Sequence, residues 1–119
     1  MIRVGQGFDV HRHSDDTDRV LVLGGCRFDG ERGLDGHSDA DVPAHAAADA
    51  LLGAAGLGDL GQHFPDSDPR WSGADSIELL AMVDPVVREF RADALPAPEV
   101  RRLPLVDQRL GRLLQGEEA

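Results

Sequence analysis

The chain has 119 residues, which is enough for one domain with a single core. Its 22 acidic and 12 basic residues give a net charge of −10, which argues against binding to nucleic acid or to an anionic membrane. Every basic residue is an arginine, so a lysine nucleophile is excluded. The single cysteine, Cys26, excludes an intrachain disulfide and a cysteine-based zinc finger.

Two short strands are predicted near the N-terminus. Residues 2–10 have a strand pattern that contains Gly5 and Gly7, and glycine within a strand often marks a bulge or the close approach of a ligand. Residues 20–23 form an apolar run that ends in two glycines, which indicates a second strand followed by a turn. Cys26 follows this turn, and we expect it to be a small buried residue.

Two helices are predicted after the strands. Residues 44–55 are rich in alanine and leucine, with Asp39 or Asp41 as the cap and glycines after the last turn. A second helix begins near residue 75 and is interrupted at Asp84–Pro85, because proline within a helix costs roughly 3 kcal/mol. Residues 59–73 between the helices are predicted to form a loop rich in glycine, proline and aspartate.

These elements indicate an α/β domain of the α+β sandwich-like type, with short N-terminal strands and helices on one face of a small mixed sheet. Beyond residue 90 the prolines predict an irregular stretch, followed by a short amphipathic helix over residues 106–115. No apolar run approaches the ~20 residues of a membrane span, and no signal peptide is visible. With a lone cysteine, these features predict a cytoplasmic protein.

The clearest candidate for chemistry combines one carboxylate with two imidazoles. Asp9 and His11 lie two residues apart, so a strand places both on the same face. His45, near the start of the first helix, completes a set of three ligands, and three protein ligands with one open position are typical of catalytic zinc. The alternative is an ordinary Asp-x-His pair and a histidine on a helix surface.

Other polar residues are weaker candidates when taken alone. His37 and Ser38 precede a helix and could contact a phosphate, although a simple capping segment has the same pattern. The residues from 64 to 69 form an aspartate-rich loop that could bind a hydroxylated ligand or only form a turn. Asp41 or Asp49 could orient the His45 ring, since both lie one helical turn from it. His13 and His63 are expected to be solvated.

Motifs in the first ~83 residues resemble the 2-C-methyl-D-erythritol 2,4-cyclodiphosphate synthase family of non-mevalonate isoprenoid biosynthesis. The matching segments occur in order and at the family's spacing. They are Arg3-Val4-Gly5-Gln6-Gly7-Phe8-Asp9-Val10-His11, Leu23-Gly24-Gly25, Gly36-His37-Ser38-Asp39-Ala40-Asp41-Val42, His45, Asp49-Ala50-Leu51-Leu52-Gly53-Ala54-Ala55, Leu57-Gly58-Asp59-Leu60-Gly61, Phe64 to Pro69, and Gly73-Ala74-Asp75-Ser76.

The resemblance implies a role for each matching residue. It implies that Asp9, His11 and His45 hold Zn²⁺ and that His37 is the catalytic residue that contacts phosphate. It places the substrate-binding positions on Val10, Ser38, Asp59, Leu60, Gly61, Phe64, Pro65, Asp66, Ser67 and Asp68. Family enzymes cyclise 4-diphosphocytidyl-2-C-methyl-D-erythritol 2-phosphate and release CMP. They are lyases and homotrimers, and they use a second divalent ion, Mg²⁺ or Mn²⁺.

Within a single domain of residues 1–119, the resemblance divides the chain into a family-like metal and substrate half, residues 1–83, and a divergent tail, residues 84–119. The family's C-terminal strands, its cytidine-binding segment and its Thr-Thr-Thr-Glu-like segment for the second metal are not found in the tail. Three hypotheses therefore stay open: an active synthase, a catalytically impaired zinc-binding remnant, and a non-enzymatic oligomeric binding module. Zinc stoichiometry tests the third hypothesis, and CMP release separates the first two.

Overall fold

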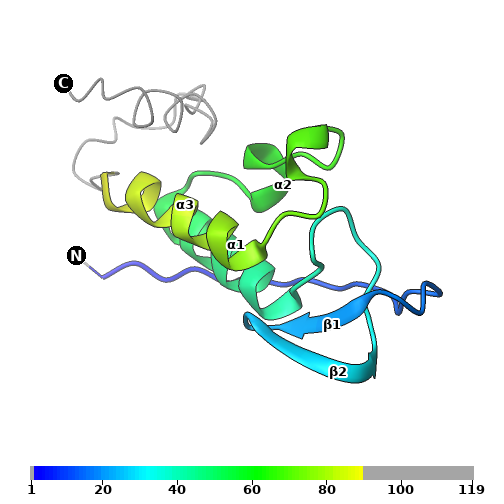
Figure 1. Ribbon diagram of the computed structural model, residues 1–119. Coiled ribbons are helices and arrows are strands. Elements are labelled where there is room, and N and C mark those ends of the chain that lie inside the picture. The colour runs from blue at the N-terminus through cyan, green and yellow to red at the C-terminus, as the bar shows by residue number, and fades with distance from the viewer. Residues whose placement is uncertain (1, 90–119) are drawn as a thin grey trace.

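The computed structural model describes residues 2–89, where a two-stranded hairpin lies beside a small group of helices (Figure 1). The strands are β1, Val20–Leu23, and β2, Cys26–Arg32. The helices are α1, Val42–Ala55, α2, Leu60–His63, and α3, Ser76–Glu89, with a 3₁₀ turn η1 at Pro69–Trp71. This arrangement confirms the α/β class. The helix expected over residues 106–115 lies outside the described residues.

The hairpin turn is tied directly to the start of α1. Strands β1 and β2 pair antiparallel, and Gly24 and Gly25 form the turn with φ of 60° and 78°, a left-handed backbone that suits glycine. Both turn N–H groups donate to the Asp41 carboxylate, at 2.7 and 2.6 Å, and the same carboxylate caps α1 through Ala44 N. Asp41 therefore fixes the hairpin to the helix.

Cys26 is exposed, so the expectation that it is buried was wrong. It is the first residue of β2, and every residue of that strand is exposed. The apolar run that predicts β1 gives no information on whether the returning strand is covered.

The N-terminal segment is extended, as its pattern predicts, but it pairs with no strand within residues 2–89. Exposed and half-buried residues alternate from Val4 to Val10, and the segment runs alongside α1 (Figure 1). A Cβ on Gly7 would lie 1.7 Å from the carbonyl oxygen of Ala46, and one on Gly5 1.9 Å from that of Ala50. The close approach that these glycines permit is therefore to the backbone of α1 and not to a ligand.

Helices α1 and α3 pack on each other and form the core. Helix α3 does not stop at Asp84–Pro85, and this corrects the predicted interruption. Val83 and Val86 are buried on either side of the proline. Their burial contributes about 1.5–3 kcal/mol each, which offsets the roughly 3 kcal/mol cost of the proline. The buried apolar core consists of Ala48, Leu52, Ala55, Leu57, Phe64, Leu79, Val83 and Val86.

The segment predicted as a loop over residues 59–73 contains both α2 and η1. Each begins at an aspartate cap, since Asp59 accepts from Gln62 N and Asp68 accepts from Arg70 N. His63 is buried, with Nε2 2.8 Å from the carbonyl oxygen of Leu57, so the expectation that it is solvated was wrong. Among residues 2–89, no helix has the length and apolar character needed to cross a bilayer.

Candidate metal centre

Three side chains from two separate parts of the chain meet beside the N-terminal half of α1. Asp9 and His11 come from the extended segment that Gly5 and Gly7 allow to lie against the helix, and His45 comes from α1. One potential ligand atom from each lies within 4.8 Å of the others. The Asp9 Oδ2 atom is 3.1 Å from His45 Nδ1 and 3.2 Å from His11 Nε2. The three residues predicted as metal ligands are therefore brought together.

The remaining nitrogen of His11 is held by the backbone. His11 Nδ1 lies 2.6 Å from the carbonyl oxygen of Asp35. A carbonyl oxygen only accepts hydrogen bonds, so Nδ1 carries the proton in the neutral ring. The lone pair of Nε2 then points toward Asp9. No sequence pattern pointed to Asp35 as the partner.

His45 is held in the same way by hydroxyl groups. His45 Nε2 lies 2.7 Å from Ser76 Oγ and 3.1 Å from Ser38 Oγ, and its Nδ1 faces Asp9. The ring is buried, with 8% of the residue exposed. Partners of this kind fix both the tautomer and the orientation of a ligating imidazole.

Neither aspartate expected to orient His45 does so. Asp41 is engaged with the hairpin turn and the start of α1. Asp49 Oδ1 accepts from Leu60 N at 2.7 Å and so holds the start of α2. Helical spacing placed both on the His45 side of α1, but unpaired backbone N–H groups compete for their carboxylates.

The donor chemistry of the three residues fits a cation. One carboxylate oxygen of Asp9 lies about 3 Å from a ring nitrogen of both His11 and His45, so a cation placed among the three groups would be attracted to the carboxylate and could accept both nitrogens as ligands. Imidazole nitrogen and carboxylate oxygen are ligands that divalent transition metals accept. Within residues 2–89, Asp9, His11 and His45 form the one group of three or more His, Cys, Asp or Glu side chains that lie close enough to hold a metal ion.

The segment just before α1 contains a strained residue beside the centre. Ala40 is fully buried with φ of 56°, the left-handed region that alanine rarely adopts. This conformation lets the two neighbouring aspartates bind different parts of the chain. Asp41 caps α1, and Asp39 accepts hydrogen bonds from Ser76 at the start of α3. Asp39 was expected only as a possible cap of α1.

His37 is oriented by the aspartate-rich loop. Its Nε2 lies 2.9 Å from the backbone carbonyl oxygen of Asp68. The Asp68 carboxylate is bound by the Arg70 side chain, with one contact of 2.6 Å. The hydrogen bonds from Arg70, together with weaker charge effects, lower the pKa of Asp68 from its ordinary value of 3.8, against a small opposing effect of desolvation. The loop is thus fixed by its own ion pair.

A cavity of about 70 Å³ lies between the metal centre and this loop. Four of the residues expected to bind substrate line this cavity: Ser38, Leu60, Phe64 and Asp66. His37 and His45 complete its polar side. Val10 lies elsewhere, on the exposed face of the N-terminal segment. The other expected substrate-binding residues do not line this cavity: Asp59, Gly61, Pro65, Ser67 and Asp68.

Two residues that line this cavity were not expected to do so. Trp71 packs edge-on against Phe64, as its expected packing role suggests, but its Nε1 is buried without a hydrogen-bond partner in the described part of the chain. Leu79 of α3 supplies apolar surface. Ser76 adjoins the site through His45. Ser76 belongs to the family-like segment Gly73-Ala74-Asp75-Ser76, but the sequence alone assigned it no role.

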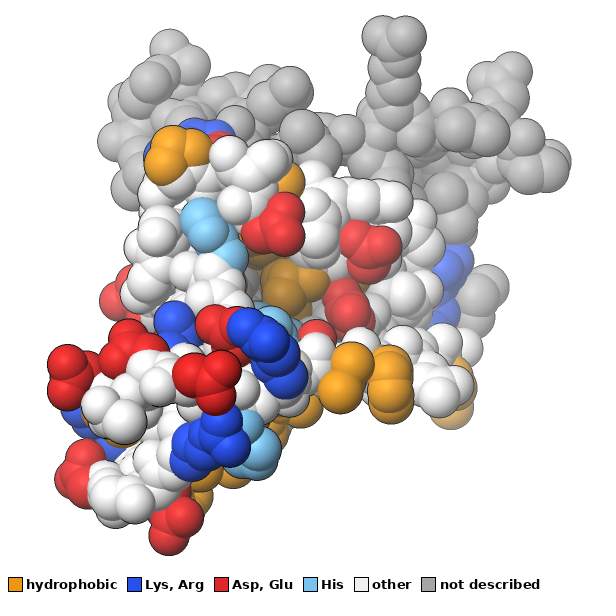
Figure 2. Space-filling view, turned by 90° about the vertical axis from the view of Figure 1, so that its right-hand side faces the viewer, with side chains coloured by type: hydrophobic (Ala, Val, Ile, Leu, Met, Phe, Trp, Pro, Cys, Tyr) orange, Lys and Arg blue, Asp and Glu red, His pale blue; other side chains and the backbone are white. Residues whose placement is uncertain are grey.

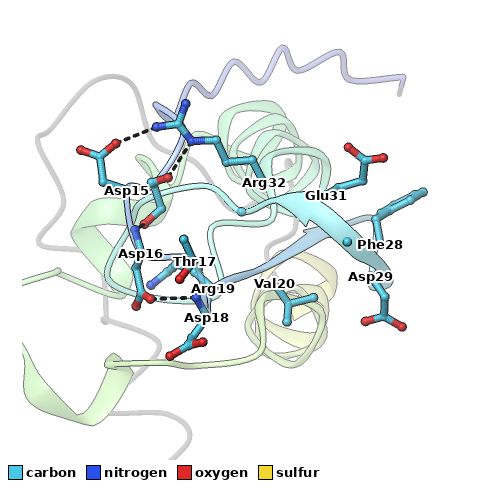
Figure 3. Close-up of a pocket in the computed structure, with 13 residues that line it drawn as sticks. Asp15, Asp16, Thr17, Asp18, Arg19, Val20, Phe28, Asp29, Glu31 and Arg32 are labelled. Carbon is cyan, nitrogen blue, oxygen red and sulfur yellow. Dashed lines mark hydrogen bonds and ion pairs between the residues drawn. The ribbon is translucent and has the colours of Figure 1, made fainter.

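A larger hollow lies apart from the metal centre, at the hairpin. We call it the hairpin pocket: it is lined by residues 14–20 and 28–33 and has a volume of about 540 Å³ (Figure 3). Acidic and arginine side chains gather on the lower part of the space-filling view (Figure 2), and several of each kind line the hairpin pocket. Arg32 pairs with Asp15 at 2.6 Å, and Asp16 accepts from Asp18 N at 2.9 Å. None of the predicted site residues lines the hairpin pocket.

Comparisons with known proteins find similar sequences and similar folds. A protein named 2-C-methyl-D-erythritol 2,4-cyclodiphosphate synthase from Geobacillus thermodenitrificans is 47% identical over 128 aligned positions, covering 100% of this chain and 79% of its own length. A structure of the bifunctional IspDF from Campylobacter jejuni has a TM-score of 0.67 and 46% identity, covering 74% of this chain and 23% of its own.

A solved synthase structure described as a CDP-bound form has a TM-score of 0.65 and 44% identity, covering 73% of this chain and 57% of its own. The chain spans about half the length of several other curated relatives. A sequence model of the YgbB family matches residues 2–94, and the chain therefore belongs to the YgbB family.

Proposed function

We propose that this chain is a phosphorus–oxygen lyase that cyclises 4-diphosphocytidyl-2-C-methyl-D-erythritol 2-phosphate and releases CMP. The curated relatives carry the name of this synthase. The observation that carries the proposal is the convergence of Asp9, His11 and His45, each ring being held by its other nitrogen. In the reaction, an oxygen of the 2-phosphate bonds to the β-phosphorus, and the bond from that phosphorus to the CMP oxygen breaks.

The proposed ion at the centre is Zn²⁺, held by Asp9, His11 and His45. When bound, it supplies positive charge that polarises the diphosphate. No protein nucleophile is required, and catalysis by this chain consists of positioning and electrostatic stabilisation. The proposed second divalent ion, Mg²⁺ or Mn²⁺, shares the charge of the diphosphate.

His37 is the proposed phosphate-contacting residue. Its Nε2 donates to the carbonyl of Asp68, so Nδ1 is the nitrogen left to face a phosphate oxygen, and it donates to that oxygen when the ring carries both protons. The neighbouring cavity joins polar groups from Ser38 and Asp66 with apolar surface from Leu60 and Phe64. We assign it to the erythritol carbon skeleton, because that moiety carries hydroxyl groups on an apolar backbone.

The proposed assembly is a homotrimer. The N-terminal segment exposes a row of apolar side chains that are 75–93% accessible: Ile2, Val4, Phe8 and Val10. A row of this kind is typical of a surface that another part of an assembly covers. The proposed location is the cytoplasm, where the exposed thiol of Cys26 stays reduced. Light scattering on the purified chain tests the assembly, and a monomer at working concentration would contradict it.

The test of function is CMP release by the purified chain with Zn²⁺, Mg²⁺ and the cytidyl substrate, with the mass recorded on the same sample. We expect turnover that His37→Ala abolishes and His13→Ala leaves intact, since His13 is exposed and does not line the cavity. Absence of turnover in a folded, zinc-loaded protein would contradict the proposal.

One observation favours a second candidate, a zinc-binding relative without activity. The chain spans only 57% of the length of the CDP-bound synthase, so part of that enzyme's machinery has no counterpart in the aligned region. This candidate predicts one zinc per chain, lost in His45→Ala, with no CMP release under any metal condition. The same experiment therefore separates the two candidates.

A further inference from the structure

We propose that Ser76 and Asp39 form a positioning relay that holds His45 with Nδ1 toward the metal. The relay consists of Asp39 carboxylate, Ser76 hydroxyl and His45 Nε2, in that order. It rests on the metal centre of the proposed function, but not on the cyclisation reaction. Ser76 and Asp39 are therefore positioning residues that act through a metal ligand, and they do not touch the reacting groups.

The direction of each hydrogen bond follows from what each group can donate. Asp39 is a carboxylate and only accepts, and the Ser76 hydroxyl donates to its Oδ1 in a short contact. The hydroxyl has one hydrogen, so toward His45 it can only accept. His45 Nε2, at 2.7 Å, must then be the donor. The remaining nitrogen, Nδ1, keeps its lone pair toward Asp9 and the metal.

Ser38 is a secondary partner. Its hydroxyl lies 3.1 Å from His45 Nε2 and 3.4 Å from Ser76 Oγ, both longer than the contact from Ser76 to His45. It also accepts from Ala40 N at 3.3 Å. Three long contacts hold a side chain less firmly than one short bond. We therefore expect Ser38 to contribute less than Ser76 to the position of the ring.

Burial prevents water from replacing the relay. Ser76 is 1% exposed and His45 is 8% exposed, so loss of the Ser76 hydroxyl leaves the Nε2 proton only the longer contact to Ser38 Oγ, with little access to water. The backbone on both sides is also fixed. Asp39 N donates to the Ala74 carbonyl at 3.0 Å, and Ser76 N donates to Asp39 Oδ2 at 3.1 Å. The segment before α1 and the start of α3 are thus joined where the relay forms.

The relay gives α3 a functional role. Ser76 is the first residue of α3, and this helix otherwise contributes only packing surface around the centre. The docking of α3 on α1 brings the hydroxyl to His45. A metal ligand on one helix is therefore held by the end of another, and the core that joins the two helices supports the metal geometry.

The experiment measures zinc affinity by competition with a chelator on the full chain, together with apo-protein stability. Ser76→Ala and Asp39→Asn are compared with the exposed control variants Ser72→Ala and Asp29→Asn. Loss of an outer hydrogen-bond partner typically weakens metal binding about 10–100-fold. We expect a loss in this range for Ser76→Ala and Asp39→Asn, a smaller loss for Ser38→Ala, and none for the controls.

Asp39→Asn gives a second readout that a purely structural role would not move. The asparagine amide can donate to Ser76 Oγ, which frees the hydroxyl to donate to His45 Nε2 and favours the opposite ring tautomer. We expect nitrogen NMR of the apo-protein, above the ordinary imidazole pKa, to show the Nε2–H form of His45 in the natural sequence and its loss in Asp39→Asn.

The proposal is overturned by unchanged zinc affinity in both variants, or by an Nδ1–H form of His45 in the natural sequence. If a variant loses apo-protein stability, the tautomer of the natural sequence alone decides the outcome. If the chain shows the expected zinc affinities and His45 tautomer but releases no CMP, the proposed cyclase activity is contradicted and the proposed relay is still supported.

Discussion

The metal centre holds one acidic side chain and the hairpin pocket is lined by several, and the two sites differ in what surrounds those carboxylates. At the centre, Asp9 faces one ring nitrogen of each of two histidines, and the other nitrogen of each ring already has a hydrogen-bond partner. In the hairpin pocket, Asp15 is paired with Arg32, and the pocket is open to solvent. Acidic charge alone therefore does not make a candidate cation site, whereas a carboxylate held against two imidazole nitrogens does.

The sharpest test of the comparison removes one ligand from the centre. His45→Ala deletes a direct ligand, so zinc affinity should fall by more than the ~100-fold expected for outer partners. His13→Ala, an exposed histidine next to the hairpin pocket, is the matched control and should bind zinc normally. Zinc content and the dissociation constant are measured on both variants. One tightly held zinc per chain in His45→Ala would show that the ligand assignment is wrong.

The next test concerns the glycine that lets the N-terminal segment reach α1. Gly7→Ala places a Cβ 1.7 Å from a backbone oxygen of α1, so the segment must move away. Overpacking of this kind costs about 1–3 kcal/mol, and here it also displaces Asp9 and His11. Denaturant unfolding should show lower stability, and zinc affinity should fall as well.

Gly53→Ala is the control for this test. Gly53 lies within α1, and its nearest neighbour would be 3.9 Å from an added Cβ. Alanine in a helix interior is favoured over glycine by about 0.5–1 kcal/mol, so this variant should be more stable with unchanged zinc binding. Equal stability loss in both variants would contradict the close approach of the segment to α1.

The sequence was sufficient to predict which three side chains meet at the candidate metal centre, because each belongs to a short pattern. Asp9 and His11 share a face by strand periodicity, and His45 follows a helix start that Asp41 caps. Those patterns are local, and the helices predicted over residues 44–55 and from about residue 75 were found, although the second continues through Pro85. The meeting of the two segments also had a sequence signal in Gly5 and Gly7, although the glycines indicated a ligand or a bulge and not a helix backbone.

The features that were missed depend on contacts between distant parts of the chain. Ser76 reaches His45 only because α3 docks on α1, and no spacing within one segment indicates this. Helix α3 continues through Pro85 because Val83 and Val86 gain more from burial than local propensity predicts. His63 is buried by the same packing. Tertiary contacts override local preference in each case.

The hairpin pocket gives a smaller expected effect. Asp15→Asn removes the ion pair with Arg32, in which both side chains are largely exposed. Exposed ion pairs contribute about 0–1 kcal/mol, so the free energy of unfolding should change by no more than this. Zinc affinity should not change, because the pocket and the centre share no residue. Weaker zinc binding in Asp15→Asn would link the two regions and break the comparison.

The smallest effect is expected at the aspartate-rich loop and appears only in acid. Arg70 lowers the pKa of Asp68 below its ordinary value of 3.8. A carboxyl with a lowered pKa in the folded state adds stability above the ordinary value, and this stability is lost as the pH falls through the folded pKa. Arg70→Gln should raise the pKa of Asp68 in a carbon NMR titration and flatten the stability curve below about pH 4.

Arg88→Gln is the matched control for this loop, because Arg88 pairs with Asp84 on α3 and makes no contact with Asp68. It should leave the Asp68 titration unchanged. Arg70 also lies over the Trp71 ring, so a change of stability at neutral pH in Arg70→Gln reports on that contact, whereas the acid dependence isolates the carboxyl. An unshifted pKa in Arg70→Gln would mean that Asp68 is held by other groups, and that His37 is oriented by a loop which does not need its ion pair.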